Sequence, residues 1–307
     1  MQCRICGANE VSEAGKVEYY SGFAWTIFDC RECLCRFTKH DEAIYDWLHS
    51  NPSSIYRLYR ELGENARRLF QEHDLAGLRQ ELSKTAKYKF VIESVEPYPR
   101  NSRLLEVGCA RGFLTSYFIL ADYDIMGTDI SSEAIAGARA AFGNHFALWD
   151  STLSQERAPY DIIYHVGTVG CVADPLGLTR QLLKLLKPGG QLLFNAPNAD
   201  SCCLKGQLWI DAAPPPDLVT LFRPGFWRKH FSSIAEVVEE MVAAPRSSAS
   251  ARIAARRQVG QKTQRAVSLI SAENYSYVRK DLIFIAILAI IMFSAIIVLH
   301  FVPAIGG

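Results

Sequence analysis

The sequence predicts an α/β protein with a doubly wound, mostly parallel sheet, a small N-terminal zinc ribbon and a C-terminal transmembrane helix. Three observations support this prediction. Apolar strands alternate with amphipathic helices between residues 101 and 195, the pattern of a parallel sheet covered on both faces. Two Cys-x-x-Cys pairs lie near the N-terminus, and a long uncharged apolar run lies near the C-terminus.

The chain has 307 residues, of which 49% are hydrophobic and 21% charged. This allows one large domain with appendages and an ordinary globular core. The formal net charge of +1 hides an uneven distribution. Residues 1–244 contain 25 basic and 30 acidic side chains, whereas residues 245–307 contain eight basic and two acidic ones. The body is therefore mildly acidic and the tail strongly basic.

The first two cysteine pairs predict a metal site. Cys3 and Cys6 form one knuckle, and Cys30 and Cys33 form another. Two such knuckles suit tetrahedral thiolate coordination of zinc, and four protein ligands indicate a structural rather than a catalytic ion. Cys35 is a fifth thiol that can replace Cys33 or pack beside it; the two-residue spacing favours Cys33.

The central region predicts regular alternation. Apolar spacing of three and four residues predicts helices over residues 55–95. Strands are then expected at 104–107, 125–129, 146–149, 162–166 and 191–195, with helices at 113–120, 133–142 and 176–186. Residues 234–242 suit a sixth strand, and residues 274–280 could form a seventh.

The C-terminal segment predicts a membrane anchor. Residues 282–302 contain no Asp, Glu, Lys or Arg, and 21 helical residues span a hydrocarbon core of about 30 Å. Arg279 and Lys280 precede this run, so the positive-inside rule places the body in the cytoplasm. The basic stretch 246–265 either lies near an anionic membrane surface or is a solvated linker.

These patterns give five segments. The expected domains are a zinc ribbon (1–40), a helical linker or lid (41–100), a cofactor-binding domain (101–244), a basic juxtamembrane segment that can include a last strand (245–281) and the transmembrane helix (282–302).

A glycine turn follows the first strand of the predicted sheet. Residues 103–113 read RLLEVGCARGF, with glycines at Gly108 and Gly112. A dinucleotide fingerprint would need a further glycine where Ala110 stands, so nothing here demands a pyrophosphate. Asp129 ends the next strand 21 residues after Gly108, the right distance for a carboxylate that accepts both ribose hydroxyls.

Two further acids lie at the ends of strands in this region. Glu106 can face an ammonium group or orient the loop, and Asp150 follows the third strand. Together with Asp129 they suit a nucleoside that carries a cationic amino acid in place of phosphates.

The motifs LLEVGCARGF, GTDIS, LWD, YDIIYHVGTVGCVADP and LLKPGGQLLFNAPN resemble those of class I S-adenosylmethionine-dependent methyltransferases, which have a Rossmann-like fold. The front knuckles and the later PPPDLVTLFRPGFW resemble members linked to sugar and cell-surface glycan modification. The resemblance covers about residues 1–241 and implies S-adenosylmethionine as cofactor.

The resemblance also implies roles for single residues. The methionine pocket would be shaped by Glu106, Gly108, Cys109 and Gly112. Asp129 would hold the ribose, Ile130 would pack on the adenine, and Asp150 would accept from the adenine amino group.

The general base is the weakest part of the match. Relatives often carry Glu-His where Gly170 and Cys171 stand here. A base is needed only to deprotonate a hydroxyl or amine, since in-line positioning does most of the work of methyl transfer. His165 is the nearest candidate, with Tyr164 and His230 behind it.

Three functions are compatible with the sequence. The preferred one is a membrane-anchored methyltransferase acting on a small-molecule, sugar or lipid-linked acceptor at the cytoplasmic face, because tethering raises the effective concentration of a membrane-bound substrate. The second is an RNA methyltransferase, which the acidic body disfavours. The third is a non-catalytic scaffold that binds S-adenosylmethionine and zinc.

Overall fold

The computed structural model describes residues 1–19, 23–39, 60–149, 157–203, 206–211, 213–242 and 250–257. The chain divides into two compact units, Met1–Val259 and Gly260–Gly307. The second unit, with the predicted transmembrane residues 282–302, lies outside the described residues. Among the described residues, no helix has the length and apolar character needed to cross a membrane.

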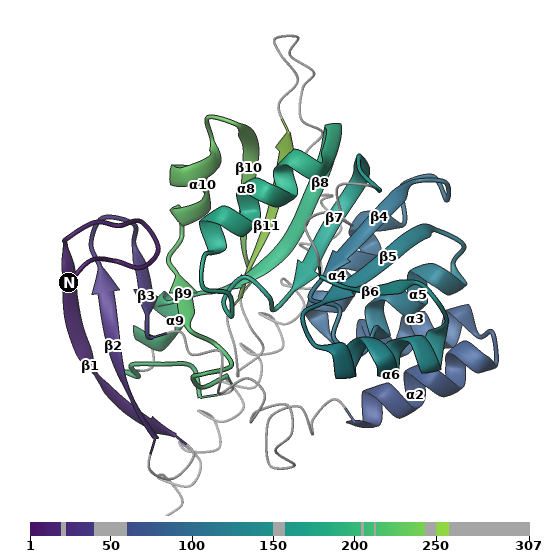
Figure 1. The fold of residues 1–307 in the computed structure, drawn as a ribbon, viewed down its shortest axis with the longest axis horizontal. Helices are drawn as coiled ribbons and strands as arrows, with labels where there is room; N and C mark the ends of the chain where they lie inside the picture. Colours follow the sequence, from purple (N-terminus) through teal and green to yellow (C-terminus); the bar gives the residue numbers. More distant parts are fainter. Residues whose placement is uncertain are drawn as a thin grey trace, which may run out of the picture. The chain divides into compact units, whose positions relative to one another are not determined.

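A seven-stranded sheet forms the centre of the first unit (Figure 1). Its order is β10-β11-β8-β7-β4-β5-β6. The strands are β4 (Arg103–Val107), β5 (Asp124–Asp129), β6 (Phe146–Leu148), β7 (Tyr160–Val166), β8 (Leu186–Pro197), β10 (Ala235–Val242) and β11 (Ser250–Arg257). Strands β4 to β8 pair in parallel, and β11 is antiparallel to both of its neighbours. The predicted doubly wound, mostly parallel sheet is confirmed.

Helices cover both faces of this sheet. One face carries α2 (Arg60–Gln71), α3 (Leu75–Ser83), α4 (Ala86–Val95), α5 (Phe113–Leu120) and α6 (Ser132–Phe142). The other carries α8 (Pro175–Leu185) and α10 (Phe226–Phe231), and Figure 1 shows α8 lying across β8. Because both faces are covered, the central strands are almost continuously buried, as in YDIIYHV of β7.

Local sequence explains where two of these helices begin. The Ser131 hydroxyl accepts from the Ala134 amide at the start of α6, and the Asp174 carboxylate accepts from the Gly177 amide at the start of α8. Both satisfy an amide that a helix N-terminus leaves unpaired. Pro175 suits the first position of α8 because its missing N–H would have no partner there.

A second, four-stranded sheet contains the N-terminal ribbon. Strands β1 (Val11–Tyr19), β2 (Phe23–Cys30) and β3 (Cys35–Phe37) are consecutive, and the fourth strand is β9 (Thr220–Phe222). Strand β9 pairs antiparallel with β3 from Cys35↔Phe222 to Phe37↔Thr220. A short helix, α9 (Asp200–Cys203), lies between β8 and β9 in sequence. The ribbon is thus completed by a strand more than 180 residues later in the chain.

The helices and strands expected between residues 104 and 195 are all present within a few residues of their predicted bounds. The C-terminal strands of the sheet differ from the prediction. The last strand among the described residues is β11, within the arginine-rich stretch, and the predicted alternative at 274–280 lies outside them. Ladder pairing uses backbone groups, so three arginines do not prevent strand formation, although they conceal it in the sequence.

Candidate functional site

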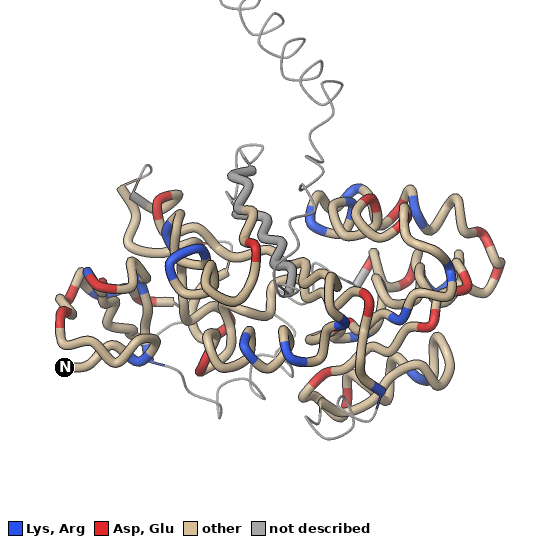
Figure 2. Tube along the Cα trace, turned by 90° about the horizontal axis from the view of Figure 1, so that it is seen from above, with Lys and Arg blue, Asp and Glu red and all other residues tan. Residues whose placement is uncertain are grey.

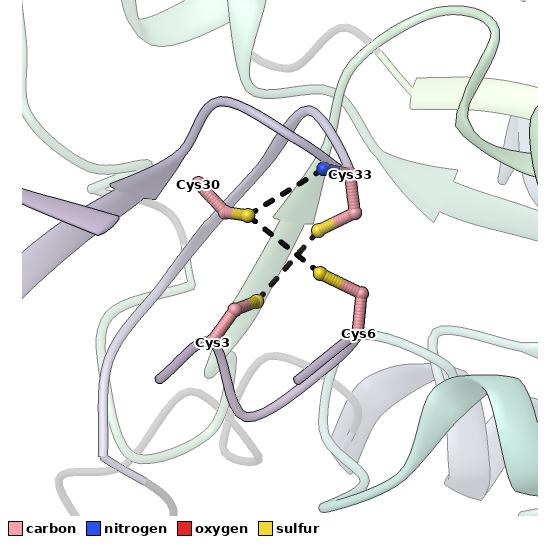
Figure 3. A group of neighbouring side chains, drawn as sticks. All are labelled: Cys3, Cys6, Cys30 and Cys33. Carbon is pink, nitrogen blue, oxygen red and sulfur yellow. Dashed lines mark hydrogen bonds between the residues drawn. The ribbon is translucent and has the colours of Figure 1, made fainter. Parts of the chain in front are cut away.

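The four predicted metal ligands come together. The Sγ atoms of Cys3, Cys6, Cys30 and Cys33 all lie within 4.8 Å of one another (Figure 3). Two Sγ–Sγ distances, Cys3 to Cys33 and Cys6 to Cys30, are each 3.7 Å. A zinc–sulfur bond of about 2.3 Å gives a tetrahedral sulfur–sulfur edge of about 3.8 Å. The cluster therefore has the dimensions of a four-thiolate zinc site.

Backbone amides support the same sulfurs. The Ile5 amide donates to the Cys3 Sγ at 3.4 Å, and the Cys33 amide donates to the Cys30 Sγ at 3.5 Å. Such donors orient a thiolate and offset its charge. Cys35 is fully buried, with its Sγ 2.9 Å from that of Cys33 and 3.9 Å from that of Cys3. The mutually close set contains Cys33, as the spacing favours.

The glycine turn lies at the carboxyl end of β4, where open α/β sheets bind ligands. The amides of Gly108 and Cys109 donate to the Thr128 carbonyl at 2.7 and 2.9 Å, which fixes the turn to β5. Ala110 has φ 47°, and its amide donates to Asp129 Oδ2 at 2.8 Å. Asp129 Oδ1 accepts from the Ser131 amide at 2.9 Å. Asp129 therefore connects the turn to the start of α6.

Close packing accounts for both glycines of the turn. Gly108 and Gly112 have φ 74° and 76°, a region that side chains rarely adopt. A Cβ at Gly108 would collide with the Thr168 side chain, and one at Gly112 would stand 2.6 Å from Phe146 Cζ. The turn is thus pressed against the loop after β7 on one side and against β6 on the other.

The predicted ribose and adenine residues are adjacent at this edge. Asp129 is partly exposed, and each of its carboxylate oxygens accepts one hydrogen bond from a backbone amide. A carboxylate offers about four acceptor sites, so acceptor capacity remains for a ligand. Ile130 is 75% exposed, which leaves its side chain free to cover a flat aromatic ring. Their roles toward the cofactor stay predictions, and Asp150 lies outside the described residues.

Glu106 lies beneath the turn and is only 3% exposed. Its Oε2 accepts hydrogen bonds from the hydroxyls of Thr115 and Tyr164. Loss of hydration on burial raises the pKa of Glu106 to about 8, although these two donors act in the opposite direction. An acid in this setting holds a proton at neutral pH unless a cation lies beside it.

Comparison with known proteins gives the family. A family model described as a methyltransferase domain matches residues 57–235, which is more than half of the chain. The chain belongs to this methyltransferase family. The matched region contains the glycine turn, Asp129 and strands β4 to β8.

The individual relatives of this chain are more distant. The ubiquinone biosynthesis O-methyltransferase of Aliivibrio fischeri is 31% identical over 103 residues, covering 31% of this chain and 44% of the relative. The malonyl-[acyl-carrier protein] O-methyltransferase of Enterobacter lignolyticus is 27% identical over 122 residues, covering 38% of this chain and 49% of the relative. The chain thus spans about half the length of these curated relatives.

Among solved structures, the CurJ carbon methyltransferase matches with 19% identity and a TM-score of 0.44, covering 71% of this chain and 64% of that one. TehB from Haemophilus influenzae matches with 17% identity and a TM-score of 0.43, covering 58% of this chain and 65% of TehB.

His165, the predicted base, is buried within the sheet. His165 lies in β7 with no exposed surface, and its ring stacks on Phe194 with 4.6 Å between the centroids. Neither ring nitrogen forms a hydrogen bond within the described chain. Burial lowers the pKa of His165 to about 3, so it stays neutral. A polar residue near a strand end can point into either layer, and the sequence does not show which.

The other candidate bases, Tyr164 and His230, are also packed against neighbouring side chains. Tyr164 is fully buried and donates to Glu106. His230 is partly buried in α10 against Phe226, and burial lowers its pKa. Cys109 is 6% exposed, and burial raises its pKa, so it is not an activated thiol.

The surroundings of the glycine turn include contacts that the motifs did not reveal. Thr168 packs against Gly108, and its hydroxyl donates to the Val107 carbonyl at 3.1 Å. A Cβ at Gly170 would collide with Leu218 and stand 2.9 Å from Pro197 Cγ. The packing at Gly170 therefore leaves no room for a side chain. No local pattern indicates these contacts, because they join segments far apart in sequence.

Proposed function

We propose that this chain is an S-adenosylmethionine-dependent methyltransferase. The observation that carries the proposal is the glycine turn held by Asp129 beside the exposed Ile130, at the carboxyl edge of the sheet in a methyltransferase-family domain. Asp129 would hold the ribose, Ile130 would cover the adenine, and Asp150 would accept from the adenine amino group. Glu106 would face the ammonium of the methionine part.

The residues present fit such a cofactor. Glu106 is buried beneath the turn, where its carboxylate can face a cation at the cofactor edge. Asp129 keeps acceptor capacity next to an exposed apolar side chain. The cofactor supplies a methyl group on a sulfonium, and the protein's part is to hold it in line with the acceptor while excluding water.

We propose that the acceptor is a sugar, a lipid-linked saccharide or another lipid intermediate at the cytoplasmic face of a membrane. The apolar residues 282–302 and the basic residues before them support an anchored enzyme. The names of the curated relatives, both O-methyltransferases, favour an oxygen acceptor atom. Figure 2 shows Lys and Arg interspersed with Asp and Glu along the described chain, which supports a substrate other than nucleic acid.

We further propose that the cysteine cluster holds one structural zinc ion. Its four thiolates complete a tetrahedron, which leaves no coordination position for a substrate. The ion would hold the two knuckles together at the end of the ribbon, whose apolar side chains pack against the rest of the domain.

Methyl-labelled S-adenosylmethionine tests the acceptor class. The full chain is incubated with separated lipid, RNA and protein fractions of its host, and the label is followed into each. We expect label in the lipid extract. Label in RNA alone would support the RNA methyltransferase instead, and a chain that binds the cofactor but labels nothing would be a scaffold.

A further inference from the structure

The first metal knuckle contacts the methyltransferase domain through one side chain. Arg4 stands between the ligands Cys3 and Cys6. Its guanidinium donates to the Ala173 carbonyl at 2.8 Å and to the Val219 carbonyl at 2.9 Å, and it also donates to the Thr220 hydroxyl. A planar guanidinium can span several acceptors in fixed directions. Arg4 thus joins the loop after β7 to the start of β9.

The same two segments are joined to each other. The amides of Val219 and Thr220 both donate to the Gly170 carbonyl at 2.9 Å. Within the loop, the Cys171 amide donates to the Thr168 carbonyl at 2.9 Å. Thr168 in turn packs on Gly108 of the cofactor turn. A continuous set of contacts therefore runs from the knuckle through β9 and the loop to the turn.

The loop after β7 lies at the carboxyl edge of the sheet, because β7 pairs in parallel with β4. It therefore follows a strand end adjacent to the turn, on the side where a second reactant can approach a bound cofactor. The ribbon has further contacts with the same part of the chain: Asp29 pairs with Arg223 at 3.5 Å, and Glu32 pairs with Lys229 at 2.8 Å.

We propose that Arg4 is a positioning residue that makes the order of the acceptor-side loop, residues 167–173, depend on the metal knuckle. This rests on the proposed function, since that function makes the loop part of the acceptor site. The metal fixes the backbone on both sides of Arg4, and Arg4 fixes Ala173 and β9. Loss of the metal frees the loop while the Asp129 side of the site keeps its own contacts.

The second knuckle offers a matched control. Arg31 follows Cys30 as Arg4 follows Cys3, but its side chain is exposed. Substitution of Arg31 therefore removes a guanidinium from the equivalent position without removing a contact to the loop.

Hydrogen–deuterium exchange on the zinc-loaded full chain tests the proposal. Arg4→Ala should speed exchange of the amides of Cys171, Val219 and Thr220 about tenfold or more, since charge-assisted hydrogen bonds are lost. Arg31→Ala should exchange like the unmodified chain. Arg4→Lys should restore protection in part, at residues 219–220 more than at 171, because one ammonium cannot span all three acceptors. Chelation of zinc from the unmodified chain should reproduce the Arg4→Ala pattern and leave β4 and β5 protected.

Zinc content and affinity for S-adenosylhomocysteine are measured on the same samples. Both should be unchanged in Arg4→Ala. Unaltered exchange in Arg4→Ala would overturn the inference, and so would loss of zinc from that variant, because Arg4 would then support the ribbon only. A chain that binds no S-adenosylhomocysteine in any form would instead defeat the proposed function, whatever the exchange rates.

Discussion

Asp129 fixes the glycine turn and is also the residue predicted to hold the ribose. Its two oxygens accept hydrogen bonds from two backbone amides, that of Ala110 in the turn and that of Ser131 before α6. The left-handed backbone at Ala110, φ 47°, is held in place by this bond. The same carboxylate can then accept ribose hydroxyls without reorganisation, which lowers the cost of binding.

Glu106 should couple cofactor binding to pH. With a pKa of about 8 it is about nine-tenths protonated at pH 7, and a bound ammonium lowers that pKa. The complex then holds fewer protons than the free protein, so affinity should rise as pH rises toward 8. Calorimetry at pH 7 in buffers of different ionisation enthalpy should show release of about one proton on binding S-adenosylmethionine.

Two variants isolate the source of that proton. Glu106→Gln should bind more weakly and release almost none, whereas Glu93→Gln, which removes an exposed carboxylate on α4, should behave like the unmodified chain. Affinities are compared between pH 5.5 and 7, below the titration of the ligand's own amino group. A flat pH profile in the unmodified chain would refute the role of Glu106.

Single residues were predictable where spacing carries the information. The four cysteines and the placement of Asp129 follow from distances along the chain, and the structure places them as expected. Burial does not follow from spacing. The burial of His165 was not predicted for this reason. The two partners of Glu106, Thr115 and Tyr164, come from α5 and β7, which only the folded sheet brings together.

At the scale of packed elements, replacing Gly170 with even the smallest side chain should reduce the stability of the fold. In Gly170→Ala the added methyl meets Leu218, Pro197 and the Thr220 carbonyl, so we expect a loss of about 1–3 kcal/mol in the free energy of unfolding. Gly137→Ala in α6 is the control, because nothing lies within 4 Å of its Cβ position. It should raise stability by up to about 1 kcal/mol. Equal stability of both variants in denaturant titrations would contradict the packing at Gly170.

The metal knuckles should require Cys33 and tolerate loss of Cys35. Cys3→Ser combined with Cys30→Ser should reduce zinc from one ion per chain to almost none, since each knuckle loses a thiolate. Cys35→Ser should keep one ion per chain. Metal analysis of the purified chains measures both. A chain that keeps zinc after Cys33→Ser but loses it after Cys35→Ser would show the opposite assignment.

The strands of the parallel sheet were predictable because buried runs and turn residues repeat along the sequence. Strands β9 and β11 were not predicted. The first has only three residues and pairs with β3 near the N-terminus, and the second is rich in arginine. Pairing between distant segments has no local sequence pattern, so the closure of the ribbon by β9 becomes visible only in the fold.

For the whole molecule, the proposed anchor should decide where the protein is found. The full chain should sediment with membranes and stay there after a carbonate wash, which releases peripheral proteins. A chain ending at Lys280 should appear in the soluble fraction, because it lacks the apolar residues 282–302. Retention of the shortened chain in the membrane pellet would contradict the anchor and would favour the basic stretch as the attachment.

The central claim is that the turn and Asp129 bind S-adenosylmethionine. Its most direct test is calorimetric titration of S-adenosylmethionine into the full chain, Asp129→Ala and Glu93→Gln. Loss of one carboxylate removes its ribose hydrogen bonds and its hold on the turn, so Asp129→Ala should bind at least about tenfold more weakly. Glu93→Gln, which removes an exposed carboxylate on α4, should bind like the unmodified chain. Equal affinity in Asp129→Ala, or no binding to the unmodified chain, would contradict the account.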